Sequence, residues 1–157
     1  MAPRINVPGR LVNASAGRVH ITRYFDTITL EVAKRSQEDY VEHCAKFGGQ
    51  AVPVVMITDR PIPMPDVEVR GYWRTIAVEP GFEAVALIMT GTLGLMAAAV
   101  THLGEQLIQV LGVSFRSFKK SDDAAYWLTE TVNCEIDEFD LMDVVDEILA
   151  LTAETAE

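Results

Sequence analysis

The sequence predicts an α/β fold, a single-domain sandwich built on a mostly parallel sheet. Two apolar runs of strand length, at 51–58 and 83–90, each precede a helical pattern, as in repeated βα units. An alternating segment at 18–35 predicts a β-hairpin at the start of the domain. The length of 157 residues suits one domain with a single substantial core.

The N-terminal third is expected to hold a loose lead, the hairpin and a first helix. Residues 1–17 are rich in Pro, Gly, Asn and Ser, which is typical of a flexible segment. In 18–35, apolar residues alternate on both sides of a central polar pair, which predicts two strands and a tight turn. A helix is expected over 36–49, with Ser36 as its N-cap.

The remainder of the predicted domain, which spans 18–132, alternates strands and helices. The run at 51–58 lacks polar interruption, as expected of a strand covered on both faces. The full order is therefore ββαβαβαβα, followed by an acidic C-terminal helix within 133–157. After the first helix, the expected elements are a strand at 51–58, a helix at 65–78, a strand at 83–90, a helix at 92–112, a strand at 113–120 and a helix at 121–132 with Ser121 as its N-cap.

The C-terminal segment carries most of the net charge of −10. Residues 135–157 hold nine acids and neither Lys nor Arg, which leaves 14 acids against 13 bases in residues 1–134. Apolar side chains recur there at helical spacing, so the helix either packs on its own domain or docks in the groove of a partner. The stripe residues expected to make that contact are Phe139, Met142, Val145 and Leu149.

Charge and composition exclude several classes of partner. The negative net charge repels nucleic-acid phosphates and anionic lipids, so neither nucleic acid nor a membrane is an expected partner. The uncharged run 84–100 is interrupted by Thr and Gly where a strand would end, and we interpret it as a strand leading into a helix. Two cysteines without a CxxC spacing, and no signal-like apolar start, favour a cytoplasmic location.

The sequence offers no catalytic or metal-binding set. His43 and Cys44 are neighbours on a predicted helix and point in different directions, so they do not form a catalytic pair, and Cys44 is expected in the core. His20 has no Cys, Asp or Glu at metal-ligand spacing. No cofactor-binding motif is present either, because the segment TGTLG at 90–94 lacks the Walker lysine and the GxGxxG pattern.

The element order and several local segments resemble STAS domains, the fold of anti-sigma-factor antagonists and of the cytoplasmic tails of sulfate transporters. The resemblance is carried by VPVVMITD (52–59), by AVALIMTG (84–91) running into a small-residue helix, and by VSFRSFKKSDDAAYWL (113–128). It implies a regulatory module that binds another protein. In antagonist-type STAS domains the loop after the central strand carries a phosphorylated Ser or Thr. Here that loop lacks the acceptor motif, and Thr58 is the only Ser or Thr between Met56 and Arg74.

Three prolines stiffen this same loop, at 60–65, which lowers the entropy lost when a partner docks. Its position at the carboxyl edge of a parallel sheet is where open α/β folds bind ligands. The alternative is a rigid connection whose apolar side chains fold back on the core. The residues expected to bind a partner or a small anion are Asp59, Arg60, Ile62, Met64, Arg70 and Arg74.

The expected function is thus non-enzymatic binding of another protein through the proline loop, the helix after it and the acidic C-terminal helix. One alternative is a sensor of a small ligand or anion with a pocket at the carboxyl edge of the strands. Another is a self-assembling scaffold subunit, because the predicted helix start TLGLMAAAV is apolar on nearly every side and could form a homodimer.

Overall fold

A six-stranded mixed sheet forms the centre of the molecule in a computed structural model, which describes residues 4–25, 28–58, 66–76, 81–89, 113–152 and 154. The strands lie side by side in chain order. The first three pair antiparallel, and β3 to β6 pair parallel. The strands are β1 (Arg4–Val7), β2 (Leu11–Ala16), β3 (Val19–Tyr24), β4 (Pro53–Thr58), β5 (Ala84–Met89) and β6 (Ser114–Phe118).

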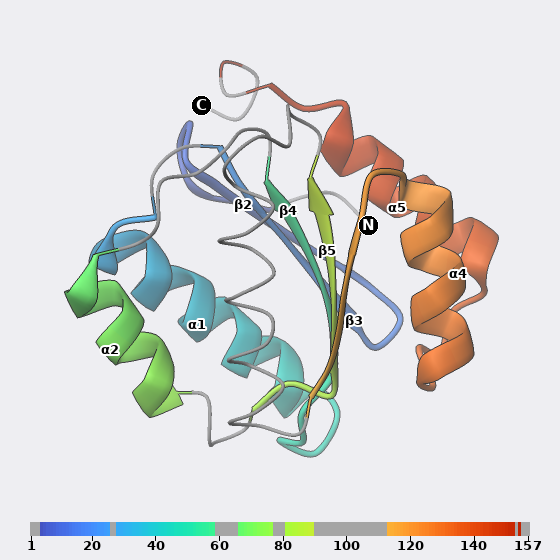
Figure 1. Cartoon of the computed structure of the whole chain (residues 1–157), viewed down its shortest axis with the longest axis horizontal. Helices are drawn as coiled ribbons and strands as arrows, with labels where there is room; N and C mark the ends of the chain where they lie inside the picture. The colour runs from blue at the N-terminus through green and yellow to red at the C-terminus, as the bar shows by residue number, and fades with distance from the viewer. Residues whose placement is uncertain are drawn as a thin grey trace.

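Helices cover both faces of the sheet and give the molecule three layers (Figure 1). One face is covered by α1 (Leu30–Ala45) and α2 (Val67–Ile76), and the opposite face by α4 (Ser121–Thr131) and α5 (Glu138–Leu149). The largest apolar cluster joins α4 and α5 to β2, β3, β4 and β5, and two smaller clusters join the other face to α1 and α2. The α/β class predicted from the sequence is confirmed.

The predicted flexible lead is wrong for residues 4–16, which form the first two strands. β2 pairs with β3 through a turn at Gly17, so the hairpin lies at 11–24 and not at 18–35. Residues 12–16 of β2 do alternate between apolar and polar, but the polar ones, Asn13 and Ser15, lie on the face that meets α1, where apolar residues would be expected.

The second half of the predicted hairpin is the start of α1. Thr29 caps this helix, since its hydroxyl accepts a hydrogen bond from the amide of Val32 at 3.3 Å. Ser36, predicted as the N-cap, is instead buried inside the helix. Ile28 and Val32 fit the alternation of a strand and the i, i+4 spacing of a helix equally well, so the apparent alternation in this segment was misleading.

The later elements agree better with the sequence. β4, β5, β6 and α2 lie where strands and a helix were predicted, and Asp66 caps α2 by accepting from the amide of Val69 at 3.0 Å. Ser121 is the first residue of α4 rather than its cap, which is Lys120. The predicted helix at 92–112 lies outside the described residues. Within the described ranges, no helix has the length and apolar character needed to cross a membrane.

Candidate functional site

The proline loop can be placed only by its ends. Asp59, Arg60, Ile62 and Met64 lie outside the described residues. Thr58 ends β4, so the loop leaves the sheet at the carboxyl edge of the parallel strands, as the sequence predicted.

Two arginines follow the loop on α2. Arg70 is half-buried, and its Nε atom is buried without a hydrogen-bond partner. In the described part of the chain Asp66 makes no ion pair with Arg70, and its carboxylate instead caps the helix by accepting from the amide of Val69. Arg74, one turn later, is exposed. The two guanidinium groups therefore differ, and only Arg70 has a desolvated and unpaired nitrogen.

Apart from Phe139, the apolar stripe of the acidic segment is covered by its own domain. Leu141, Val145 and Ile148 are buried to 1% exposure or less in the main core cluster. Met142 and Leu149 are partly buried against the same cluster. The hypothesis that Val145 docks in a partner's groove is therefore wrong, because α5 uses this stripe to cover its own sheet.

A turn at the opposite edge of the sheet fixes the loop between α4 and α5. The amide of Arg18 donates to the carbonyl oxygen of Cys134 at 2.8 Å. At Gly17, where φ is 57°, an added Cβ would lie 2.5 Å from that same oxygen. Only glycine can hold both the positive φ and this close approach, so the β2–β3 turn and the α4–α5 loop fit together.

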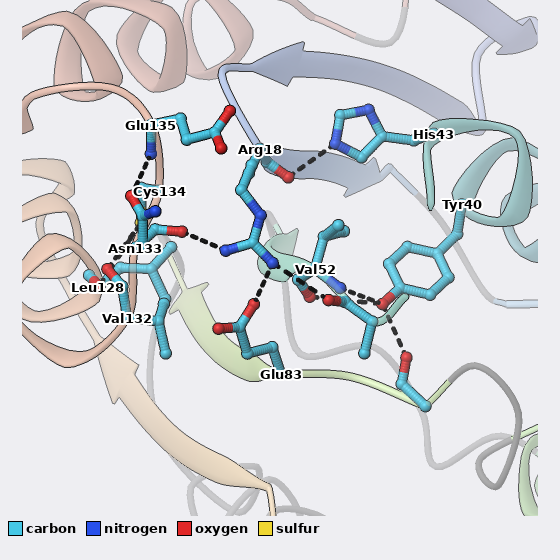
Figure 2. A network of polar contacts seen from close by, with 12 residues as sticks. Arg18, Tyr40, His43, Val52, Glu83, Leu128, Val132, Asn133, Cys134 and Glu135 are labelled. Atoms are coloured by element: carbon cyan, nitrogen blue, oxygen red, sulfur yellow. Dashed lines mark hydrogen bonds and ion pairs between the residues drawn. The ribbon is translucent and has the colours of Figure 1, made fainter. Parts of the chain in front are cut away.

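The Arg18 side chain joins three segments at the amino edge of the parallel strands (Figure 2). Its guanidinium donates to Glu83 at 2.7 Å, to the carbonyl of Asn133 and, at 3.4 Å, to the carbonyl of Ala51. Glu83 directly precedes β5, and Asn133 lies in the α4–α5 loop. A planar fork of donors suits such a set of acceptors, and this arginine thereby links the two helical layers through the sheet.

The outward surface of α4 and α5 is left strongly negative. Residues 121–149 contain ten acids and no Lys or Arg, whereas residues 1–120 contain 11 acids and 13 bases. Phe139 is 65% exposed and Tyr126 is 56% exposed on these two helices. We call this surface the acidic face. Its exposed acids on the helices themselves are Asp122, Asp123, Glu130, Asp140, Asp143, Asp146 and Glu147.

Beneath α1, by contrast, the structure holds a buried polar seam that the sequence did not indicate. Asn13 donates to the Asp39 carboxylate at 2.7 Å, and the Tyr24 hydroxyl donates to Ser36 at 3.0 Å. His20 and His43 lie in the same layer, both about 5% exposed. Alternation of these residues with apolar ones in the strands is the only signal that could have located them, and it resembles that of a solvent-facing strand.

The cysteines behave as the sequence predicted for Cys44. Its side chain is buried among apolar residues, next to the Tyr40 ring. Burial raises the pKa of both thiols, and that of Cys134 reaches about 11. Among the described residues, no group of three or more His, Cys, Asp or Glu side chains could hold a metal ion.

Comparison with known protein families, curated proteins and solved structures identifies no relative of this chain. No protein-family model matches the chain, and no curated protein or solved structure matches it.

Proposed function

We propose that the chain is a non-enzymatic, STAS-like regulatory module that binds a protein partner through its acidic face. The observation that carries the proposal is the contrast between the two sides of α5. One side of the helix is occupied by the core, and the other side presents acids together with Phe139. An exposed aromatic ring surrounded by charge is typical of a contact surface, since aromatic anchors supply much of the binding energy in protein interfaces.

The charge of the acidic face defines the partner. Ten acids without a base repel a second copy of the same surface, so a homodimer through this face is disfavoured. A partner with a basic patch is attracted instead, and its association rate rises at low ionic strength. The apolar contribution comes from Phe139 and Tyr126, which lie on different helices of this layer.

The proline loop is the second part of the proposed contact surface, and it follows the end of β4, at the edge of the sheet opposite the α4–α5 loop. Its role rests on the sequence features given above, namely three prolines and apolar side chains at the carboxyl edge of the strands. A partner that touches both would have to span the sheet edge, so the two surfaces are best tested separately.

The acidic face is tested by placing a photo-crosslinking amino acid at position 139 of the full chain, expressed in cells of the organism from which the protein comes. The matched control is the same amino acid at Val41, which is 45% exposed on α1 at the opposite side of the sheet. We expect position 139 to capture one defined basic protein that position 41 does not. Capture of the same proteins from both positions would contradict the proposal.

A second candidate function is anion sensing at the carboxyl edge, which the unpaired Nε of Arg70 favours. A guanidinium that is partly desolvated and unpaired binds phosphate or carboxylate strongly when one arrives. Inorganic phosphate should then raise the melting temperature of the wild-type chain and of Arg74→Met, but not that of Arg70→Met. No shift in any of the three would remove this candidate.

A further inference from the structure

Two histidines meet at the interface between α1 and the sheet, near the amino edge of the parallel strands. His20 lies on β3 and His43 in the last turn of α1, with ring centroids 5.6 Å apart. The Tyr40 ring lies edge-on to His20, with centroids 5.5 Å apart. The pair therefore sits where the carboxyl half of α1 is held against the sheet.

The surroundings of the two rings favour their neutral forms. The Nε2 of His43 is 2.7 Å from the carbonyl oxygen of Arg18, so Nε2 carries the proton and donates it (Figure 2). The Nδ1 of His43 and the Nε2 of His20 are buried and have no hydrogen-bond partner. A second proton on either ring would be buried without an acceptor, which is costly.

The charged groups around the pair reinforce this cost. Besides burial, the charges of Lys46 and Arg18 lower the pKa of His43, against the opposite effect of the Arg18 carbonyl that accepts from the ring. Burial is also the main cause for His20, and the charge that His43 would gain lowers its pKa further. Glu83 is already bonded to the Arg18 guanidinium, at 2.7 Å. Asp39, on the same helix, accepts from Asn13 and lies 3.9 Å from Arg35. The other titratable groups in contact are Tyr40 and Cys44, which are neutral because burial raises the pKa of each.

We propose that His20 and His43 form an acid-sensitive latch, which holds the carboxyl half of α1 on the sheet while both rings are neutral and releases it when they take up protons. The release is local, because the α4–α5 layer is packed on the opposite face of the sheet and contains no histidine. Cys44, which is 1% exposed under this half of α1, becomes accessible on release, whereas Cys134 on the other side stays covered.

The direction of the effect follows from linkage. Desolvation by burial lowers the pKa of His20 to about 3, and it also lowers the pKa of His43. A histidine that regains its ordinary pKa of about 6.5 on opening binds more protons in the open state, so closure is fully stable above that pH and weakens below it. Between pH 7 and 5 the opening constant rises about 25-fold for one histidine that stays neutral in the closed state, and the lowered pKa of the second adds to this rise.

The test is thiol labelling of the full chain with a pyridyl disulfide, which reacts in acid, and mass spectrometry to assign the label to Cys44 or Cys134. Rates are divided by those of the unfolded chain at the same pH. We expect the corrected Cys44 rate to rise at least about 25-fold between pH 7 and 5, while that of Cys134 stays within about threefold. This window lies above the ordinary pKa of carboxyl groups, so Asp and Glu do not contribute.

Two substitutions separate the latch from general acid unfolding. His43→Gln keeps an N–H that reaches the Arg18 carbonyl, and His20→Phe keeps a flat ring against Tyr40. We expect the double variant to show a flat Cys44 rate over this window. Should the double variant not fold, His43→Gln alone should reduce the rise to that of one histidine. Equal rises at both cysteines, no rise in the wild type, or an unchanged rise in the variants would each overturn the proposal.

Discussion

The carbonyl oxygen of Cys134 occupies the space in which a side chain at Gly17 would begin. An ideal Cβ at Gly17 would lie 2.5 Å from that oxygen, and the residue has φ 57°. This contact joins the turn between β2 and β3 to the loop between α4 and α5, two segments more than a hundred residues apart in the chain. The acidic layer is thereby fixed to the sheet by backbone, independently of its apolar packing.

Gly17→Ala should therefore destabilise the protein severely. The positive φ costs about 1–2 kcal/mol for a non-glycine residue, and the forced shift of a backbone oxygen adds about 1–3 kcal/mol. Urea unfolding followed by circular dichroism measures the difference in the free energy of unfolding. Gly48→Ala is the matched control, because its φ is 74° and nothing lies within 4 Å of an added Cβ. Equal losses in the two variants would show that the turn and the loop are not in contact.

Replacement of Arg18 tests the hydrogen bonds that its side chain makes beside that turn. Arg18→Met removes donors to Glu83 and to the carbonyls of Asn133 and Ala51, which should cost about 2–4 kcal/mol in the free energy of unfolding. Arg74→Met is the control, because Arg74 is exposed on α2, and surface substitutions change the free energy of unfolding by only about 0.5 kcal/mol. A loss below 1 kcal/mol at both positions would mean that Arg18 does not link the layers.

The packing of α5 on its own domain predicts a contrast between two neighbouring apolar residues. Leu141→Ala should cost about 2–5 kcal/mol, because Leu141 is fully buried in the main core cluster. Phe139→Ala should change the free energy of unfolding by less than about 0.5 kcal/mol, because that ring is 65% exposed. For the same reason a chain that ends at Val132 should aggregate or unfold in size-exclusion chromatography. A stable monomeric truncation would show that α5 is dispensable for the fold.

Burial of both thiols predicts that they are inert in the native protein. Cys44 and Cys134 are 1% and 3% exposed, and burial raises the pKa of each, so thiolate is scarce at pH 7 to 8. Native-state alkylation at pH 8 should be slower than that of the chain in urea by about a hundredfold or more. Fast reaction of either cysteine in the native protein would contradict its placement in the core.

The α/β class could be predicted because β4 and β5 are continuous apolar runs, which few other structures explain. The start of the chain could not, for reasons visible in particular residues. In β2 and β3, Asn13, His20 and Thr22 are buried against α1, where they replace the apolar residues that mark a strand. The hydrogen-bond partners of Asn13 and Thr22 come from α1, later in the chain, so no local pattern predicts them. Ile28 and Val32 fit both the alternation of a strand and the i, i+4 spacing of a helix, and the structure shows a helix that is capped by the hydroxyl of Thr29.

The candidate site was predictable in part. The acidic C-terminal segment stood out by charge, but its amphipathic pattern did not reveal whether the core or a partner covers the apolar stripe. Which of the two covers the stripe depends on the apolar residues of β2 to β5 that face α5. The sequence predicted a flexible segment where β2 lies, so that part of the covering surface was not foreseen. The loop at 60–65 could be placed at the carboxyl edge because a loop after a parallel strand always leaves from that edge.

Charge reversal on the acidic face tests the central claim most directly. Asp143→Lys with Glu147→Lys inverts two exposed acids on α5, and Glu31→Lys with Glu42→Lys makes the same change in net charge on α1, at the opposite side of the sheet. The measurement is the affinity of each variant for the basic protein that crosslinks at position 139, at two salt concentrations. We expect the α5 pair to weaken binding at least tenfold at low salt, with a smaller loss at high salt, and the control pair to bind like wild type. Equal affinity of both variants would contradict the assignment of the acidic face as the contact surface.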